Sequence, residues 1–390
     1  MLVSRVTTSV TCAEHNPCIN ALDHAMSYVT RLEALRRKRL ETLKREGPDQ
    51  ETFTQWRSPR FGTSNPQNLT NRFWTYAIRH GGNSHSLNQD LNGPDEWEAG
   101  PCFSFQRYGA AALTLKDGRQ VLIGGAHEDF YDPGFCIYND VVVIDGEAIT
   151  IYGYPEDVFP PTDYATATQV GDEIWIIGNL GYQEHRCDGP AQVRVLNIQD
   201  WSIRTEHCTG DDPGSIWGHR CELSSDGRQL LISGGQRHCE LVGVEAQSLL
   251  NPNLHLLELA TSTWAGFDRG ETCQQWLFTP NDQGNLNTTN ELVADAIPDN
   301  NLLHGTLIQG TNELLFRRPL GRLDDQVLQI TVKNQGRSAM VCIQGPLSLL
   351  TKSPRFSLEQ LLTDLKQLLG SHFACAPLEA VLLERKPQQR

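Results

Sequence analysis

Three segments of the chain repeat one pattern, and this repeat constrains the fold more than any other feature. In each segment, one strand leads through an Asp-Gly or Gly-Asp turn to a second, apolar strand that ends in glycine. The closing glycines, Gly124, Gly178 and Gly234, are 54 and 56 residues apart. Two strands that flank such a turn indicate a β-hairpin. We therefore expect the second strands to hold equivalent positions in a repeat protein: Val121–Ile123, Ile174–Ile177 and Leu230–Ile232.

Each unit continues with a further short strand, which begins near Tyr138, Gln192 or Asn253. In the second and third units a turn and a tryptophan follow, Trp201 and Trp264. The glycine doublet, the Asn-Asp-Val or Asn-Leu start, the strand, the turn and the tryptophan together resemble kelch-repeat β-propeller proteins. The resemblance covers about residues 103–268, and the second unit departs from it by keeping one glycine of the doublet.

The resemblance implies four-stranded antiparallel blades that pack face to face around a channel. In such blades a glycine at the end of the second strand allows close approach to the channel. Tryptophan fills the space between blades, so we predict that Trp201 and Trp264 are buried there. The predicted fold class is mainly β: a kelch-type β-propeller with an N-terminal helix and a C-terminal α+β portion.

Three units are too few to close a propeller, because four to eight blades are usual. Residues 70–100 could supply one further partial blade, and residues 301–390 a degenerate last blade. The alternative for 301–390 is a small separate α+β domain. We accordingly divide the chain into an N-terminal helical arm and linker over 1–72, the propeller over 73–300 and the C-terminal segment over 301–390.

Local signals predict the elements outside the repeat. Residues 16–46 show helical spacing of apolar side chains and carry the basic run Arg36–Arg39. Residues 73–78 fit a strand or a short helix, and Gly81–Gly100 is rich in Gly, Asn and Asp, which is typical of a loop. Near the C-terminus, Ser357 and Gln360 form a capping box before a leucine stripe that Gly370 ends. The strands expected on either side of this helix are 326–333, 338–344 and 379–384.

The charge balance excludes two classes of partner. The net charge of −14 repels nucleic acid and anionic membrane surfaces, so we expect neither as a partner. No apolar run reaches the roughly 18 residues that span a bilayer, and the N-terminus has no apolar secretory core. Eleven cysteines without framework spacing are then expected to be reduced thiols of a cytoplasmic protein.

The chain carries none of the familiar motifs for phosphate binding, zinc proteases, serine hydrolases or dinucleotide binding, so no cofactor is predicted. Cys12, His15 and Cys18 place three ligand types within seven residues. Their spacing matches no usual finger pattern and a fourth ligand is missing. We therefore predict no metal centre, and leave open whether these three residues bind a metal.

One charged stretch suggests where function resides. Residues 121–185 hold twelve acids and no Lys or Arg. Loops that follow the glycine-ended strands of neighbouring blades share one rim of a propeller. These loops bring together imidazoles, carboxylates, aromatic rings and one arginine. The candidate binding residues are His127, Glu128, Asp129, Tyr131, Asp132, Tyr182, His185, Arg237 and His238.

This set of residues supports three interpretations. The first is a protein-interaction module whose rim loops bind a protein or peptide partner, with aromatic residues as anchors. The second is an enzyme with an acid/base or metal-assisted site at the channel mouth. The third is a divalent cation site of His127, Glu128, Asp129 and Asp132. We favour the first, with a basic or cationic partner. The chain's own helix at Arg36–Arg39 is one candidate occupant of the acidic loop. Taken singly, each acid is more typical of a solvated loop residue.

Overall fold

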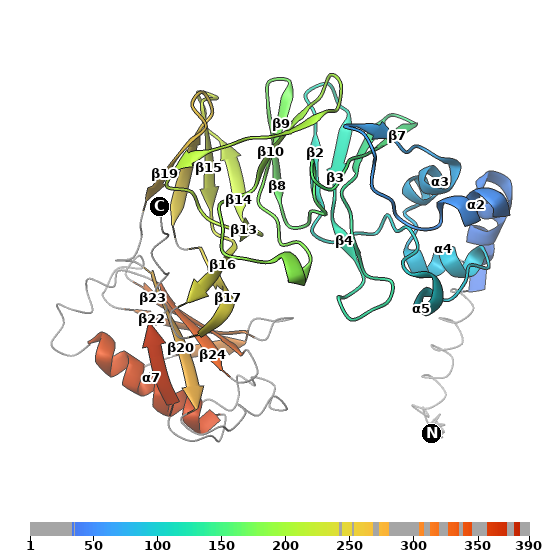
Figure 1. Ribbon diagram of the computed structural model, residues 1–390. Coiled ribbons are helices and arrows are strands. Elements are labelled where there is room, and N and C mark those ends of the chain that lie inside the picture. Colours follow the sequence, from blue (N-terminus) through green and yellow to red (C-terminus); the bar gives the residue numbers. More distant parts are fainter. Residues whose placement is uncertain are drawn as a thin grey trace, which may run out of the picture. The chain divides into compact units, whose positions relative to one another are not determined.

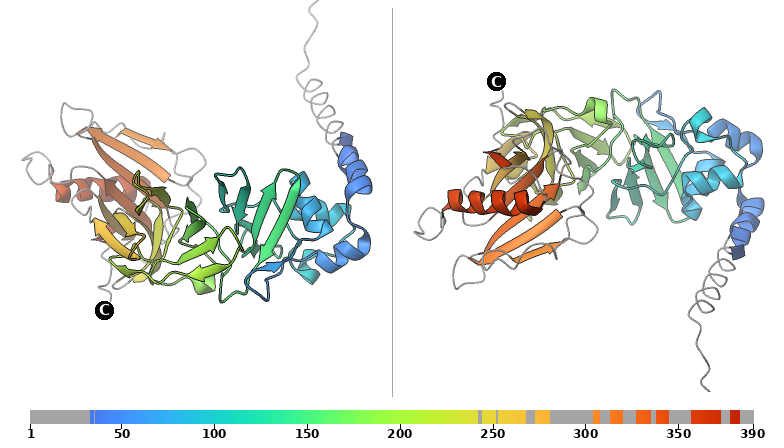
Figure 2. Two further views of the ribbon diagram at one scale, coloured as in Figure 1. Left: turned by 90° about the horizontal axis from the view of Figure 1, so that it is seen from above. Right: turned by 90° about the horizontal axis from the view of Figure 1, so that it is seen from below.

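The computed structural model describes residues 33–34, 36–241, 244–251, 253–267, 273–280, 304–307, 313–319, 327–334, 338–344, 357–372 and 378–382. The chain forms two compact units (Figures 1 and 2). The first comprises Met1–Pro59, Thr70–Gln106 and Phe130–Gly134, and the second comprises Arg60–Leu69, Arg107–Asp129 and Phe135–Arg390. Within the described ranges, no helix combines the length and the apolar character that crossing a membrane requires.

The first unit is helical. It contains α2 (Gln50–Trp56), α3 (Arg72–His80), α4 (Ser84–Asp90) and α5 (Glu96–Ala99), and residues 36–46 are also helical. An Asp or Asn side chain caps each of the four named helices, as Asn71 does by accepting the N–H of Trp74 at 2.9 Å. Phe53, Phe73, Trp74 and Phe103 form the core, in which the rings of Trp74 and Phe103 stack at 4.6 Å.

The structure corrects two expectations for this region. Residues 70–100, all of them described, contain helices and no strand, so they are not a partial blade. Gly81–Gly100 is not a continuous loop, because Asn83 and Asp95 cap the short helices α4 and α5. The ambiguous segment 73–78 lies within α3, whose C-cap Gly81 takes the left-handed conformation with φ of 60°. Asparagine and aspartate favour helix starts as well as loops, so this composition is compatible with both structures.

The second unit is built largely from antiparallel sheets. The first sheet has the order β1-β7-β6-β3-β2, formed by β1 (Gln67–Asn68), β2 (Ala111–Thr114), β3 (Gln120–Ile123), β6 (Val141–Asp145) and β7 (Ala148–Gly153). The second sheet has the order β11-β10-β9-β8, formed by β8 (Thr166–Val170), β9 (Glu173–Ile177), β10 (Val193–Asn197) and β11 (Ile203–Thr205).

The third sheet repeats the arrangement. Its order is β12-β19-β18-β15-β14, with β12 (Thr209–Gly210), β14 (Arg220–Leu223), β15 (Gln229–Ser233), β18 (Leu254–Glu258) and β19 (Thr263–Phe267). The three apolar strands that the repeat identified are β3, β9 and β15. Each pairs on one side with the strand before it, β2, β8 or β14, and on the other with β6, β10 or β18, so the predicted equivalence in three successive sheets is confirmed.

Two apolar cores join the successive sheets. One contains Val121 and Val141 of the first sheet with Ile174 and Leu196 of the second. The other contains Trp175 and Ile177 of the second sheet with Leu230 and Ile232 of the third. Trp201 belongs to the former and Trp264 to the latter, and these residues are 7% and 3% exposed. The prediction that both tryptophans are buried between neighbouring sheets is confirmed.

Two smaller pieces extend from the repeating sheets. β4 (Ala126–His127) and β5 (Cys136–Ile137) form a short ribbon, and the 3-10 turn η1 covers Gln183–His185. β13 (Ile216–Trp217), β16 (Gln236–Leu241) and β17 (Val244–Leu250) form a three-stranded sheet. The segment after Gly235 is therefore a strand, β16, rather than a loop. Its N-terminal end pairs with β13, whose backbone takes up the donors and acceptors that a loop would leave free.

The C-terminal sheet has the order β21-β22-β23-β24-β20-β25. Its strands are β20 (Cys273–Pro280), β21 (His304–Leu307), β22 (Glu313–Pro319), β23 (Val327–Asn334), β24 (Ala339–Gln344) and β25 (Leu378–Leu382). Helix α7 (Leu358–His372) contributes Leu361, Leu365 and Leu369 to its core. The predicted helix and its flanking strands are confirmed, although α7 continues two residues past Gly370. β20 precedes residue 300, and the predicted domain boundaries stay predictions.

Candidate functional site

His127 lies on β4 and is 3% exposed, and neither imidazole nitrogen has a hydrogen-bond partner among the described residues. Burial, together with the nearby charge of Arg107, lowers the pKa of His127 to about 4. Its ring lies 5.5 Å from that of Tyr138, centroid to centroid. At neutral pH the side chain is therefore an uncharged imidazole inside the protein, and it does not supply a cation.

A buried ion pair lies beside His127. Arg107 donates from its two terminal nitrogens to the two carboxylate oxygens of Asp140, at 2.6 and 2.9 Å. The Arg107 guanidinium also lies 3.3 Å from the centre of the Tyr138 ring, and it donates to the Gly124 carbonyl at 3.1 Å. Both charged side chains are about 95% buried. This bidentate pair fixes the end of β3 against the start of β6, which is a structural role.

Glu128 and Asp129 follow β4 directly, and the Glu128 backbone takes a left-handed φ of 58°. The Tyr108 hydroxyl donates to the Glu128 carbonyl. Burial first, and then the charges of Asp129, Asp163 and Glu128 with the Tyr164 ring, raise the pKa of Tyr108 to about 12. The predicted acids therefore lie close to an aromatic side chain that sequence reasoning did not select.

Tyr182 reaches the same ribbon from the second unit of the repeat. Its hydroxyl accepts the backbone N–H of Ile137 at 2.9 Å, and its ring meets the edge of Phe135 at 5.5 Å. Burial raises the pKa of Tyr182, so its hydroxyl stays protonated. His185 lies on η1 and is exposed, whereas His127 is buried.

Arg237 and His238 lie on β16. Arg237 pairs with Ile216 of β13 and its Nε has no partner within the described structure. His238 is 9% exposed, and its Nδ1 lies 3.0 Å from the Ser248 hydroxyl. Burial, followed by the charge of Arg186, lowers the pKa of His238. Its ring stacks on Trp217 at 6.4 Å. These two residues therefore belong to a sheet surface rather than to a mobile rim loop.

Tyr131 and Asp132 belong to the first unit, which carries three exposed aromatic side chains. Trp97, Phe130 and Tyr131 are 78%, 71% and 71% exposed, and the Phe130 and Tyr131 rings meet edge to face at 5.4 Å. Asp132 and Pro133 of the same loop line a pocket together with Trp97. We define the acidic aromatic patch by its three rings and three carboxylates: Trp97, Phe130, Tyr131, Asp95, Glu96 and Asp132.

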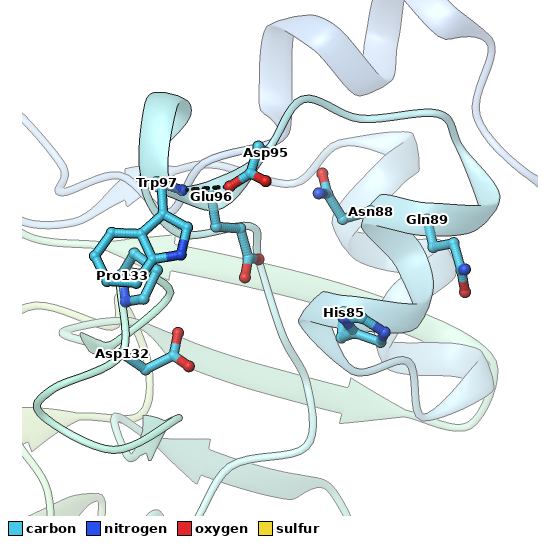
Figure 3. A pocket seen from close by; sticks show the side chains of 8 residues that line it. All are labelled: His85, Asn88, Gln89, Asp95, Glu96, Trp97, Asp132 and Pro133. Atoms are coloured by element: carbon cyan, nitrogen blue, oxygen red, sulfur yellow. Dashed lines mark hydrogen bonds between the residues drawn. The ribbon is translucent and has the colours of Figure 1, made fainter.

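The pocket within this patch encloses about 330 Å³. Figure 3 shows Trp97, Pro133 and Asp132 on one side of it and His85, Asn88 and Gln89 on the other. Its lining contains three carboxylates and no Lys or Arg. A Cβ atom at Gly134 would lie 2.9 Å from Glu96 Oε2 and 3.1 Å from Asp132 Oδ1, so these two carboxylates approach the same point of the loop. The pocket is thus suited to a cationic group.

A buried arginine holds the walls of this pocket in place. Arg57 is 5% exposed and donates to Asn88 Oδ1 at 2.9 Å, to the Ala99 carbonyl at 3.1 Å and to the Pro94 carbonyl at 3.4 Å. These bonds connect α2 to α4 and to the segment that carries α5. The Asp95 side chain accepts the Trp97 N–H at 2.8 Å, which sets the start of α5. The pocket is therefore supported by hydrogen bonds from its own unit.

The basic helix, the possible metal ligands and the cysteine thiols are three further groups that the sequence offers as candidates. Arg39 donates to Asp90 Oδ1 at 3.0 Å and to the Ser86 hydroxyl at 3.3 Å, so it binds α4 rather than the loop at 128–132. Among the described residues, no three His, Cys, Asp or Glu side chains are placed to hold one metal ion. Cys12, His15 and Cys18 lie outside the described residues. Burial raises the pKa of Cys102 and of Cys136 to about 12, so neither thiol is an activated nucleophile.

Sequence reasoning missed Arg57, Trp97, the Arg107–Asp140 pair and Tyr164. The signal for Tyr164 was available, because it stands midway between Gly109 and Gly218, at spacings of 55 and 54 residues. Trp97 and its neighbouring acids carried an aromatic and acidic signal of the same kind as residues 128–132, but they lie outside the repeat. Arg57 and Asp140 gave no local signal, because their roles depend on partners far away in the sequence.

Comparisons with known proteins give little further information. No family model matches the chain, and no curated protein matches it. Among solved structures, one described as "Structure of YjhT" aligns with 9% sequence identity and a TM-score of 0.27. The alignment covers 60% of this chain and 64% of that one, and a similarity this distant supports no conclusion about function.

Proposed function

We propose that the chain is a protein-interaction module, and that the acidic aromatic patch binds a basic segment of a partner protein. The observation that carries this proposal is the exposure of three large rings beside a pocket lined by carboxylates. Large aromatic side chains are normally buried, and a group of them at the surface is typical of an interaction site. Binding would bury the rings and would place Lys or Arg side chains beside Asp95, Glu96 and Asp132.

The charge of the whole chain supports a basic partner. The net charge is −14, and the pocket lining adds no Lys or Arg. Carboxylates around an aromatic anchor speed the encounter with a basic surface and discriminate against acidic ones. An Arg or Lys side chain also gains a cation–π contact when it lies over the face of an exposed tryptophan. Trp97 is therefore the anchor that we expect to contribute most.

We further infer that the three repeating sheets are consecutive blades of a kelch-type β-propeller. The four antiparallel strands that share one order in the three sheets, and the cores between the sheets, support this inference. So do the positive φ values of 59°, 81° and 64° at Gly124, Gly178 and Gly234. In this frame, the chain between β4 and β5 is a rim loop, and Phe130–Gly134 is the part of it that belongs to the first unit.

The test neutralises the patch without removing its hydrogen bonds. In the combined variant Asp95→Asn, Glu96→Gln and Asp132→Asn, the amide oxygens still accept the Trp97 and Gly134 N–H groups that the carboxylates bind now. A fluorescent oligoarginine peptide serves as the probe in anisotropy titrations. We expect its affinity to fall about tenfold or more, and the dependence of its affinity on salt to weaken.

The matched control removes three exposed carboxylates elsewhere. Glu156→Gln, Asp157→Asn and Asp172→Asn change the net charge by the same amount within the second unit. Equal loss of affinity in the two variants would mean that the peptide responds only to net charge, and the patch would then have no special role. Trp97→Ala must also weaken binding at unchanged net charge, since a purely electrostatic surface would not respond to that substitution.

A second candidate function is catalysis. The observation that favours it is the burial of Asp163. Its carboxyl group is 3% exposed, and burial raises its pKa, as is found for general acids. The same carboxyl accepts the Gly181 N–H at 2.8 Å, a bond that also suits a structural role. Carbon-13 NMR titration of Asp163 separates the two, because a pKa at or below 3.8, the ordinary value, removes the enzyme candidate.

A further inference from the structure

Tyr164 occupies a backbone position that is glycine in both neighbouring repeat units. Gly109, Tyr164 and Gly218 each stand two residues before the first paired residue of β2, β8 and β14. All three have left-handed φ values, of 65°, 53° and 62°. Glycine adopts this conformation freely, whereas a bulky side chain adopts it only at a cost in free energy. The second repeat unit therefore has a tyrosine in a left-handed conformation, whereas the first and third repeat units have glycine at the equivalent position.

The surrounding backbone maintains this conformation. The Tyr164 N–H donates to the Gly109 carbonyl at 2.7 Å, and the Gly218 N–H donates to the Tyr164 carbonyl at 2.8 Å. A Cβ atom at Gly109 would lie 2.9 Å from the Tyr164 ring, so Gly109 leaves the space that this ring fills. An added Cβ at Gly218 would meet nothing within 4 Å. The Tyr164 ring therefore fills the space beside Gly109, and of the three equivalent positions only 164 carries a ring.

The Tyr164 side chain lies at the centre of a row of rings from three successive repeat units. Its ring centroid is 6.3 Å from that of Tyr108 and 5.8 Å from that of Trp217. Tyr108 is 40% exposed, and Tyr164 and Trp217 are half-buried, so the row is accessible to a ligand. We define the aromatic row as Tyr108, Tyr164 and Trp217.

Carboxylates lie near one end of the aromatic row. The pKa of Tyr164 is raised by burial and then by the charges of Asp163 and Asp129, and the same two carboxylates act on Tyr108. The faces of aromatic rings carry negative charge density, and nearby carboxylates strengthen the attraction of the rings for a positive group. Water screens this attraction less at half-buried rings than at fully exposed ones. The chemistry of the row therefore selects for a cation with an apolar surface.

We propose that the aromatic row binds an organic cation of the quaternary ammonium type, and that binding depends on Tyr164. Backbone strain that persists in a fold is often found where a side chain is needed for function. At position 164 the fold would be relaxed by glycine, as the two neighbouring units show. The tyrosine ring at this position instead joins Tyr108 to Trp217 in one row. The aromatic row shares no residue with the acidic aromatic patch, and the proposal does not depend on that patch.

The test uses choline as the probe, with the intact chain and ligand-observed NMR. We expect choline to bind, and its neutral carbon isostere, dimethylbutanol, to bind about tenfold or more weakly. Tyr164→Gly should weaken choline binding by about tenfold or more, while Tyr164→Phe, which keeps the ring, should change it by less than about twofold. The patch variant at Asp95, Glu96 and Asp132 should leave choline binding unchanged, which separates the two sites.

Thermal unfolding of Tyr164→Gly separates a binding role from a structural one. A structural role of the ring predicts a lower melting temperature, and a binding role does not. If Tyr164 is retained for binding, Tyr164→Gly relieves the left-handed strain, and its melting temperature equals or exceeds that of the parent. A lower melting temperature in Tyr164→Gly would show that the ring is needed for packing and would overturn the proposal. Three other results would also overturn it: no binding of choline, equal binding of its neutral isostere, or unchanged binding in Tyr164→Gly.

Discussion

His127 and His219 are imidazoles whose protonation the fold opposes. They are 3% and 6% exposed, and burial lowers the pKa of each to about 4. In the unfolded chain a histidine titrates near 6.5. Between these two values the unfolded state binds more protons than the folded state, so stability is present above about pH 6.5 and falls as the pH drops toward 4.

The first prediction concerns this pH dependence. We expect the free energy of unfolding to fall between pH 7.5 and pH 5, with His127 contributing about 1–2 kcal/mol of the loss. His127→Gln removes that titration, so the variant should lose less stability over the same interval. Urea denaturation at the two pH values measures the difference. Equal losses in the parent and the variant would show that the folded protein accommodates the protonated imidazole.

Gly178 has only a hydrogen atom as its side chain, which allows the second sheet to lie close to the segment that leads into the third sheet. Its φ is 81°, and an added Cβ atom would overlap the carbonyl oxygen of Ile216 and lie 2.8 Å from Cε1 of His219. Both atoms come from the segment that leads into the next sheet. The backbone of the second sheet therefore approaches the following unit as closely as glycine allows.

The second prediction follows from that approach. Gly178→Ala combines a left-handed backbone with a clash against main-chain atoms, so we expect a loss of more than about 2 kcal/mol. Gly146→Ala is the matched control, because Gly146 has a φ of 59° but open space around it. The control should cost only about 1–2 kcal/mol, which is the backbone contribution alone. Denaturant midpoints that do not differ between the two variants would contradict the argument.

At the scale of elements, the cores between sheets hold the repeating units together. One core joins the first sheet to the second and contains Trp201. The other joins the second sheet to the third and contains Trp264. The ring of Trp201 stacks on Tyr152 of the first sheet at 5.5 Å, and its carbonyl accepts the Tyr154 hydroxyl at 2.8 Å. The tryptophans thus connect elements that are consecutive in the repeat but distant in the chain.

The third prediction tests this role. Trp264→Ala removes a ring that is 3% exposed, and we expect it to destabilise the protein by about 3–5 kcal/mol. Trp97→Ala is the control, because Trp97 is 78% exposed and its removal should change stability by less than about 0.5 kcal/mol. The comparison is made by urea denaturation followed by far-ultraviolet circular dichroism. A small effect of Trp264→Ala would mean that the second and third sheets pack without it.

At the scale of the whole molecule, the described cores are separate. The core of the C-terminal sheet contains Phe278, Ile330 and Val341 with the leucines of α7. It shares no residue with the two cores that join the repeating sheets, among the residues that the structure describes. Separate cores can open separately, with different free energies of local unfolding.

The fourth prediction uses that separation. Leu365→Asp places a charge at a fully buried position of α7, and we expect the C-terminal sheet to lose hydrogen-exchange protection while β9 and β15 keep theirs. Gln367→Asp is the control, because it adds the same charge at an exposed position of the same helix. Loss of protection in all the sheets together would show that the C-terminal core and the repeating sheets unfold as one cooperative unit.

The sequence could predict elements whose signals are local. The Asp-Gly turns, the alternation of the strands and the capping box at Ser357 each act within a few residues, which is why β3, β9, β15 and α7 were located correctly. The same local reasoning failed over residues 81–100, where Asn and Asp are compatible with both loops and helix caps. There the choice depended on distant partners, because Arg57 donates to Asn88 of α4 and to the Ala99 carbonyl at the end of α5.

By itself, the sequence determined a mainly β repeat with glycine-ended strands, two tryptophans between sheets and an acidic loop near residues 128–132. These follow from periodicity, turn chemistry and spacing, which are properties of short segments. Only the tertiary structure decided that Arg107 pairs with Asp140, that Arg57 supports the pocket beside Trp97, and that Tyr164 lies between Tyr108 and Trp217. The reason is that each of these contacts joins residues tens of positions apart, and their distances are set by how whole sheets and helices pack.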